Sequence, residues 1–170
     1  LPDKAPSFFF LDIQSDQLAE FNQRLSDNEA VEKVETAPML RGLVTQINGR
    51  PAAEVGGDHW VLRGDRGISY SRDMPDNTSL TAGEWWPKDY TGQPQISFSA
   101  EAAEEIGIGL GDSLTLNILG RDITATITSL RDVDFSNAGM GFVILLDAAT
   151  LQGAPHSHIA TVYATEASEV

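Results

Sequence analysis

Residues 141–153 read GFVILLDAATLQG, an apolar run followed by an aspartate and a short helical segment. The run Phe142–Leu146 predicts a buried strand. Asp147 is well placed to cap the helix that follows, because its carboxylate can accept hydrogen bonds from the first free backbone N–H groups. The stretch therefore predicts a strand, a cap and a short helix that ends near Gly153. A final strand over Ile159–Ala164 completes a β-α-β unit.

The same plan occurs near the start of the chain, where residues 8–21 read FFFLDIQSDQLAEF. The aromatic and apolar run over 8–13 predicts a buried strand, and Ser15 is a natural N-cap for a helix over 16–26. Apolar residues recur at helical spacing in that helix, which predicts a face that packs on the core. A strand over 41–47 follows, so we expect the chain to contain two β-α-β halves.

The segment between the halves consists mostly of predicted strands and turns. Apolar residues alternate over 114–127, which predicts a hairpin with its turn at Gly120-Arg121. We expect an α+β fold in two parts. Residues 5–50 and 131–165 form a discontinuous subdomain from both β-α-β halves, and residues 51–130 form an inserted, mainly β subdomain.

Local signals place a few further elements inside the inserted segment. Ser99 is positioned to cap a helix over 100–106, and Gly107 can take the left-handed conformation that ends it. Short strands are predicted over 60–62 and 68–71.

Composition narrows the classes of partner. The chain has 11 basic and 25 acidic side chains, a net charge of −14. Such a surface repels phosphates, so we expect no nucleic-acid partner. There is no cysteine, which excludes disulfides and thiolate metal sites, and no apolar run reaches the ~18 residues of a membrane span. The chain starts at Leu1 without a methionine, and we interpret it as part of a longer protein.

Ser113 lies in Gly111-Asp112-Ser113-Leu114, four letters typical of the nucleophile of GDSL-type esterases. An esterase serine needs an oriented histidine base, and no aspartate lies three residues before any of the three histidines. A predicted helix precedes Ser113 and a predicted strand follows it, which reverses the order expected for such a nucleophile. We interpret Gly111-Asp112 as the turn that begins a strand.

Metal and cofactor patterns are weak. His156 and His158 bring two imidazoles together without a third ligand. Asp132 and Asp134 lack a surrounding loop of regularly spaced oxygen ligands. Residues 56–60, GGDHW, lack the strand–loop–helix context and the lysine of a phosphate-binding loop. We therefore expect no catalytic residues, no metal and no cofactor.

Trp85 and Trp86 stand in GEWWPKDYTGQP, residues 83–94, between chain-breaking residues. Neighbouring residues of a strand face opposite ways, so we expect one indole in the core and the other exposed. An exposed tryptophan is typical of a contact site. Trp85 and Trp86 are thus the candidate contact loop.

The order of motifs from Trp85 to Leu130 resembles a known family. It is similar to the periplasmic region of FtsX-like, MacB-type ABC transporter permeases. The matching elements are, in order, Gly83-Glu84-Trp85-Trp86, Ile96–Phe98, Ala103–Gly107, Gly111-Asp112, Leu114–Ile118, Gly120-Arg121 and Ile123–Leu130. The opening APSFFFLDIQSDQLAEF and the closing HIATVYA look closest to the large YbbP-type permeases.

The resemblance implies an extracytoplasmic domain of an inner-membrane protein, with a porter-like subdomain interrupted by a Sabre-like insertion. It also implies a cytoplasmic ABC ATPase as partner, a lipid, lipoprotein or other hydrophobic substrate, and a periplasmic partner protein. In this family the domain transmits motion and is not an enzyme. Two alternatives stay open: a free-standing ligand-binding, glycan-binding or adhesion module that uses Trp85 and Trp86, and, more remotely, an esterase that uses Ser113.

Overall fold

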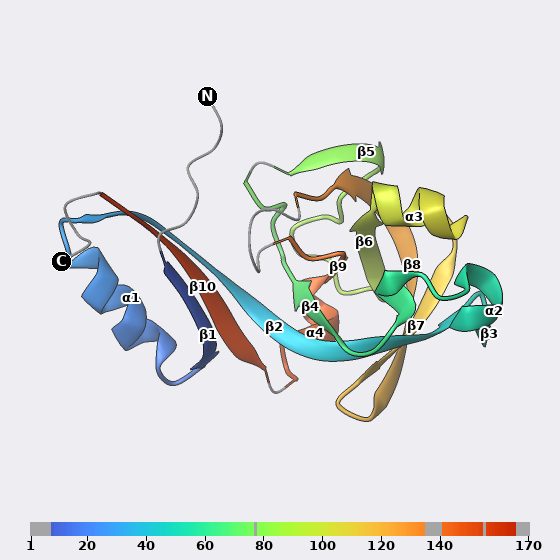
Figure 1. Cartoon of the computed structure of the whole chain (residues 1–170), viewed down its shortest axis with the longest axis horizontal. Helices are drawn as coiled ribbons and strands as arrows, with labels where there is room; N and C mark the ends of the chain where they lie inside the picture. The colour runs from blue at the N-terminus through green and yellow to red at the C-terminus, as the bar shows by residue number, and fades with distance from the viewer. Residues whose placement is uncertain (1–7, 77, 135–140, 155, 166–170) are drawn as a thin grey trace. The chain divides into compact units, whose positions relative to one another are not determined.

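The structure, a computed structural model, describes residues 8–76, 78–134, 141–154 and 156–165 (Figure 1). Its elements are β1 (Phe8–Gln14), α1 (Leu18–Ser26), β2 (Val31–Ile47), β3 (Arg50–Pro51), α2 (Ala52–Gly56), η1 (Trp60–Leu62), β4 (Arg66–Tyr70), β5 (Ser79–Gly83), β6 (Gln95–Ser99), α3 (Ala100–Ile106), β7 (Ser113–Ile118), β8 (Arg121–Asp132), β9 (Ile144–Leu146), α4 (Ala148–Leu151) and β10 (Ser157–Ala164). The expected α+β class is confirmed. None of the described helices combines the length and apolar character that a bilayer crossing requires.

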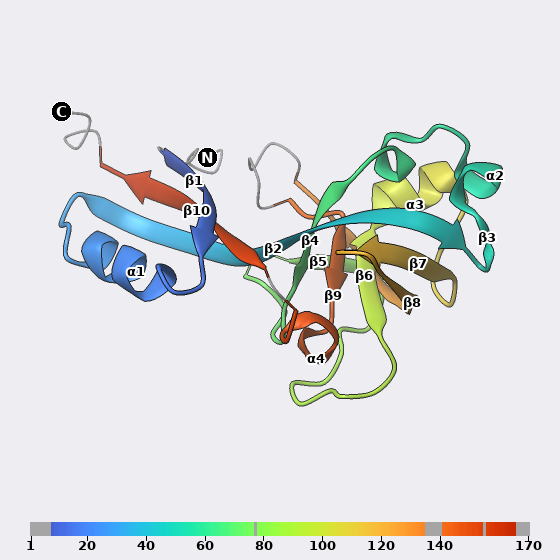
Figure 2. The same cartoon turned by 90° about the horizontal axis from the view of Figure 1, so that it is seen from below.

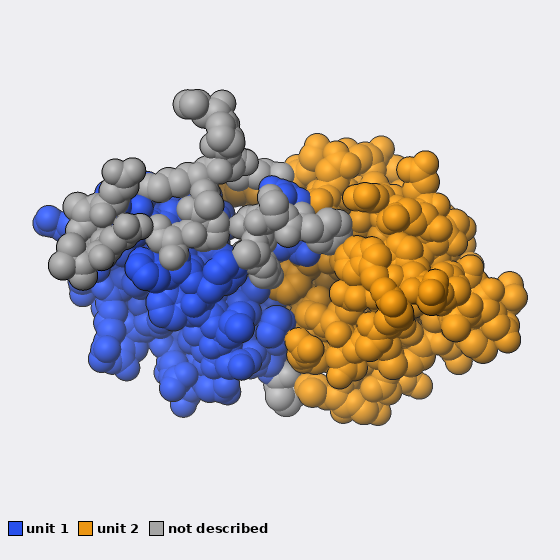
Figure 3. Space-filling model, viewed as in Figure 1, with its two compact units in different colours: residues 1–39, 134–141, 155–170 blue, residues 40–133, 142–154 orange. Residues whose placement is uncertain are grey.

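The chain forms two compact units (Figure 3). Unit 1 comprises residues 1–39, 134–141 and 155–170, and unit 2 comprises residues 40–133 and 142–154. These units differ from the subdomains expected from the sequence at residues 40–50, 131–133 and 142–154, all of which belong to unit 2. The expected assignment of porter-like and Sabre-like parts therefore stays a prediction.

Unit 1 is a small sheet with one helix beside it. The strand order is β1-β10-β2 and both pairings are antiparallel, so β1 and β2 run parallel with β10 between them. Helix α1 connects β1 to β2 and lies along this sheet (Figures 1 and 2), where Phe21 packs edge-on against Phe10 with ring centroids 4.9 Å apart. The first expected β-α-β half is thus a split unit, with β10 inserted into it.

Strand β1 is less buried than the sequence predicted. Only Ile13 is buried in it, whereas the run of four apolar residues before Asp12 is exposed: Phe8 45%, Phe9 42%, Phe10 37% and Leu11 66%. The predicted strand is confirmed. Its predicted burial is wrong, because β1 lies at an edge of the sheet and pairs only with β10 among the described strands. Asp12 has a left-handed φ of 56°, and the register shifts between Phe10 and Ile13, so β1 carries an irregularity.

Helix α1 begins at Leu18, two residues later than expected, and Ser15 does not cap it. The Ser15 hydroxyl instead lies 3.3 Å from Nε2 of His158. None of the residues of α1 is fully buried. The expected core-facing stripe is therefore only half-buried.

Unit 2 is built on a closed circuit of strand pairings. Strand β2 pairs with β7, β7 with β8, β8 with β6, β6 with β9, β9 with β4, and β4 again with β2. Two of these pairings, β4–β9 and β6–β8, are parallel. Gly42 lies where β2 pairs with both β4 and β7, and an added Cβ would come within 2.5 Å of Ile68 and 2.9 Å of Ile118. A glycine there lets the strands approach closely.

The second β-α-β half differs from the expectation. Strand β9 is fully buried and pairs with β4 and β6, and α4 follows it inside unit 2. The next strand, β10, belongs to unit 1. The two halves share a sequence plan, but in the structure they do not form matching units.

Local signals were predicted more accurately. Ser99 accepts a hydrogen bond from the Ala102 N–H, and Gly107 ends α3 with a φ of 88°. Asp147 caps α4 as expected. The hairpin of β7 and β8 is confirmed, with Leu119 and Gly120 as its turn residues, one position earlier than expected. Residues 60–62 form a 3₁₀ turn where a strand was predicted.

Candidate functional site

The loop that follows β5 carries the tryptophan pair, and Gly83 sets its direction. Gly83 has a φ of 74°, and a Cβ there would collide with the carbonyl oxygen of Thr128 and lie 2.9 Å from Cα of Ser129. The Glu84 N–H donates to the same Thr128 carbonyl at 3.2 Å. The strand therefore ends sharply at a position that only glycine fits.

Both indoles turn to the same segment. The rings of Trp85 and Trp86 lie with centroids 4.1 Å apart, and their Nε1 groups donate to the carbonyls of Arg72 and Ser71 at 3.1 and 2.9 Å. Trp86 is 4% exposed and Trp85 is half-buried. One indole is buried, as expected. The other is half-buried and does not face the opposite way, because the chain has left strand geometry at Gly83. Their role as a contact loop stays a prediction.

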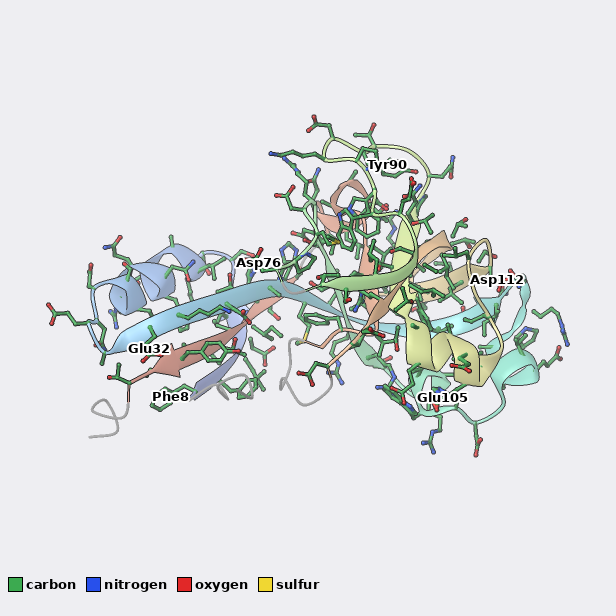
Figure 4. The ribbon with its side chains drawn as sticks, turned by 90° about the horizontal axis from the view of Figure 1, so that it is seen from above. Phe8, Glu32, Asp76, Tyr90, Glu105 and Asp112 are labelled. Carbon is green, nitrogen blue, oxygen red and sulfur yellow. The ribbon has the colours of Figure 1, made fainter. Side chains whose placement is uncertain are left out.

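A pocket of about 150 Å³ opens beside this loop, wholly within unit 2. One wall is the loop itself, which includes Tyr90 (Figure 4), and the opposite wall is α4. The lining residues are Arg72, Trp86, Pro87, Lys88, Asp89, Tyr90, Thr91, Ala148, Ala149 and Gln152. The small side chains of Ala148 and Ala149 on α4 leave this space open.

The walls of the pocket are held by several hydrogen bonds. The Tyr90 hydroxyl donates to the carbonyl of Gln93, and the Tyr90 N–H donates to Pro87 at 3.1 Å. The carboxylate of Asp147, which is fully buried, accepts from the N–H groups of Gln95 and Thr150 at 2.9 and 3.2 Å. These bonds tie α4 to β6 and fix the position of the second wall.

The pocket carries an excess of positive charge. Arg72 and Lys88 line it, against the single carboxylate of Asp89. Within the described part of the chain, neither cation forms an ion pair. A locally cationic pocket is unusual in a chain of net charge −14, and it favours a negatively charged ligand.

The sequence did not predict this pocket as a whole. Lys88 and Tyr90 stand in the quoted loop, but Arg72 and the residues of α4 are distant from it in the chain. No local pattern signals that these segments meet. The pairing of β9 with β6 brings α4 beside the loop. The sequence of neither strand predicts this pairing.

Ser113 is the first residue of β7 and follows a tight turn, as the sequence predicted. Gly111 has a φ of 89°, and the carboxylate of Asp112 accepts from the Gly109 N–H at 2.8 Å and from the side chain of Asn48 at 3.0 Å. In the described residues, Ser113 forms no hydrogen bond to a histidine. The geometry of an activated serine is therefore not found there.

The histidines bond elsewhere. The ring of His59 caps η1 by accepting from the Val61 N–H at 3.2 Å, and its Nε2 lies 3.2 Å from Glu105 of α3. His156 and His158 lie with ring centroids 5.0 Å apart, and burial together with His156 lowers the pKa of His158. Over the described ranges, no three metal-ligating side chains gather in one place.

Of the aspartates considered as metal ligands, Asp132 ends β8 and Asp134 follows it, and both are exposed. Their neighbour Arg131 is the more unusual residue. It is 5% exposed, and burial lowers its pKa to about 10. Its Nη2 group donates to the carbonyl of Phe142 at 2.6 Å, which ties β8 to the segment just before β9.

Residues 56–60 were considered as a phosphate-binding loop. They run from the last residue of the five-residue helix α2 to the first residue of η1. They do not lead from a strand into a helix, which is the arrangement that a phosphate-binding loop requires.

Comparisons with known proteins place these observations in context. No family model matches the chain. The chain is 27% identical over 157 residues to an uncharacterized ABC transporter permease, YbbP, from Escherichia coli (strain K12). The match covers 92% of this chain but only 19% of that permease, so the chain spans about a fifth of the relative's length. This match confirms the resemblance to YbbP-type permeases and supports a domain of an ABC transporter permease.

Proposed function

We propose that the chain is an extracytoplasmic, periplasmic domain of an FtsX-like ABC transporter permease that transmits motion from a cytoplasmic ATPase. The motion would drive export or extraction of a lipid, a lipoprotein or another hydrophobic substrate. The single observation that carries this proposal is the similarity to a YbbP permease over 92% of the chain. An ABC permease works with an ATPase, so the ATPase is the partner that this similarity supports most directly.

We also propose that unit 1 forms the main part of a porter-like subdomain and that unit 2 corresponds to the Sabre-like insertion. The split β-α-β arrangement of unit 1 and the discontinuous course of the chain support this assignment. No catalytic role is proposed. Ser113 has no histidine bonded to it in the described residues, and this speaks against the esterase alternative.

The location can be tested by cysteine labelling in the full-length permease. These 170 residues contain no cysteine, and Leu119, which is 60% exposed in the β7–β8 turn, is a suitable site for one in a permease whose other cysteines have been replaced. A membrane-impermeant maleimide should label a Leu119→Cys variant in cells whose outer membrane alone is permeabilised. Labelling that requires lysis of the inner membrane would refute an extracytoplasmic location.

Transmission of motion can be tested by distance measurement in the reconstituted transporter. Spin labels at Leu11→Cys and Leu119→Cys, both exposed positions, should report a different distance distribution when a hydrolysis-deficient ATPase holds ATP. The matched control is a label pair inside unit 2, at Leu110→Cys and Leu119→Cys, whose distribution should not change. An unchanged distribution for the first pair would contradict a mechanical role.

The pocket of unit 2 supports a second candidate, a ligand-binding module. Trp86 lines this pocket, but only 4% of its surface is exposed. A neutral sugar that stacks on an indole needs an open ring face, so the glycan reading receives little support. Titration of glycans against the Trp85→Ala and Trp86→Ala variants distinguishes this candidate, because unchanged binding rejects the loop as its site.

A further inference from the structure

The pocket between α4 and the loop of residues 83–94, called the tryptophan loop below, has the size of a small ring compound. Its volume is about 150 Å³, and an apolar cavity of that size in another protein accommodates benzene. Trp86, Tyr90, Ala148 and Ala149 supply apolar lining. A flat apolar body about the size of a benzene ring is therefore what this space fits.

The positive charges around the pocket favour a ligand whose polar group is negatively charged. Arg72 and Lys88 line it without an ion pair to any described residue. Asp89 is the one carboxylate in the lining, so two positive charges oppose one negative charge. An arginine guanidinium matches the planar, two-oxygen geometry of a carboxylate, and hydrogen bonds to charged groups are the stronger class.

The pocket is preformed, which lowers the cost of binding. The backbone of Arg72 is held by the Trp85 indole at 3.1 Å, and that of its neighbour Ser71 by Trp86 at 2.9 Å. The carboxylate of Asp147 fixes α4 by accepting hydrogen bonds from the N–H groups of Gln95 and Thr150. The backbone of Arg72 on one wall and helix α4 on the other are thus held in place without a ligand.

We propose that this pocket binds a carboxylate group carried on a small, flat apolar body, with Arg72 and Lys88 as the residues that bind the carboxylate. The carboxylate can come from a free organic acid or from the C-terminal residue of a polypeptide. This inference does not depend on the transporter function, since it rests on unit 2 alone.

The test is titration of the 170-residue chain with benzoate, followed by tryptophan fluorescence and by calorimetry, with benzyl alcohol as the uncharged probe. Benzoate should bind saturably and benzyl alcohol at least fivefold more weakly. Arg72→Gln should weaken benzoate binding about tenfold, because it removes a charge-assisted hydrogen bond. Arg121→Gln, an equal change of charge at an exposed residue outside the lining, should leave binding unchanged.

A second variant distinguishes binding inside the pocket from a general attraction of anions to surface charges. Ala149→Leu fills the space without changing any charge and suits a helical position, so it should abolish binding while circular dichroism shows an intact fold. The source of the carboxylate is distinguished with the peptide Gly-Gly-Phe, prepared with a free and an amidated C-terminus. Binding of the free-acid peptide indicates a polypeptide ligand, and binding of benzoate alone indicates a small organic acid.

Four results would overturn the proposal. They are no saturable binding of either acid, equal binding of benzoate and benzyl alcohol, equal weakening by Arg72→Gln and Arg121→Gln, and tighter binding of inorganic phosphate than of benzoate, because the apolar lining would then play no part.

Discussion

Unit 1 and unit 2 bury apolar surface to very different extents. The residues of the main hydrophobic cluster, from Leu40 to Leu151, all belong to unit 2. In the described part of unit 1, buried apolar side chains are limited to Ile13 and to residues of β10: Ile159, Ala160, Val162 and Ala164. A closed circuit of strands encloses a core, whereas a short sheet with one helix has little to enclose. We therefore expect unit 2 to be the more stable unit.

The two units can also be observed separately. The three tryptophans of the chain, Trp60, Trp85 and Trp86, all lie in unit 2. Tryptophan fluorescence thus reports on unit 2, and hydrogen exchange of α1, β1 and β10 reports on unit 1.

The largest expected effect is the loss of a core side chain from unit 2. Phe98 in β6 is 1% exposed, and its replacement by alanine removes buried apolar surface and leaves a cavity. Phe98→Ala should lower the free energy of unfolding by about 3–5 kcal/mol, measured by urea denaturation with tryptophan fluorescence. Leu110→Ala, at a residue that is 48% exposed, should change it by less than about 0.5 kcal/mol. Similar losses for both variants would contradict the assignment of the core.

A second, somewhat smaller loss of stability is expected from substitution of Gly83, where the tryptophan loop begins. Gly83 and Gly120 both have positive φ, but only at Gly83 would a Cβ meet other atoms. Gly120→Ala should cost about 1–2 kcal/mol for the backbone conformation alone. Gly83→Ala should cost about 1–3 kcal/mol more, because of the collision with Thr128, and should shift the tryptophan emission. Equal costs would show that this close approach is not essential.

In unit 1, a contact of α1 is expected to contribute less. Phe21 is half-buried against Phe10, so Phe21→Ala should cost about 1 kcal/mol. The loss should appear as faster hydrogen exchange in α1, with no change in the tryptophan transition of unit 2. Asn22→Ala, on the exposed side of the same helix, is the control. A shift of the tryptophan transition by Phe21→Ala would contradict the prediction that this contact stabilises unit 1 alone.

The smallest effect is a pH dependence confined to unit 1. Burial and the neighbouring His156 lower the pKa of His158 below its ordinary value of 6.5. Between that lowered pKa and 6.5 the unfolded chain binds more protons than the folded one, so stability falls as the pH falls through this window. Hydrogen exchange in β10, corrected for its intrinsic pH dependence, should show weaker protection at pH 5.5 than at pH 7.5. In His158→Gln this difference should shrink, and an undiminished difference would exclude His158 as its source.

The features that the sequence predicted correctly are those set by neighbours in the chain. Ser99, Gly107 and Asp147 act as predicted because a helix end is satisfied within a few residues. The hairpin after Ile118 follows from the alternation of its two strands. The α+β class follows from counting such elements.

The features that the sequence did not predict depend on contacts between distant segments. An apolar run such as Phe8–Leu11 predicts a buried strand whatever its position in a sheet. Here the run is exposed because β1 lies at the edge of the sheet. The parallel pairings of β4 with β9 and of β6 with β8 join segments far apart in sequence. These pairings close the circuit of strands in unit 2 and bring Arg72 and α4 to the tryptophan loop. No short stretch of sequence therefore predicts the circuit or the pocket.

The irregularity of β1 has a consequence for how the molecule behaves at high concentration. Phe8–Leu11 is an apolar ribbon on an outer strand, the kind of segment onto which further chains can add to start a fibre. Asp12 follows at once, with a left-handed backbone and a register shift, so a straight, uncharged template ends after four residues. Replacing this aspartate with valine would remove that stop, and the repulsion between acidic molecules would remain as a barrier to fibre growth.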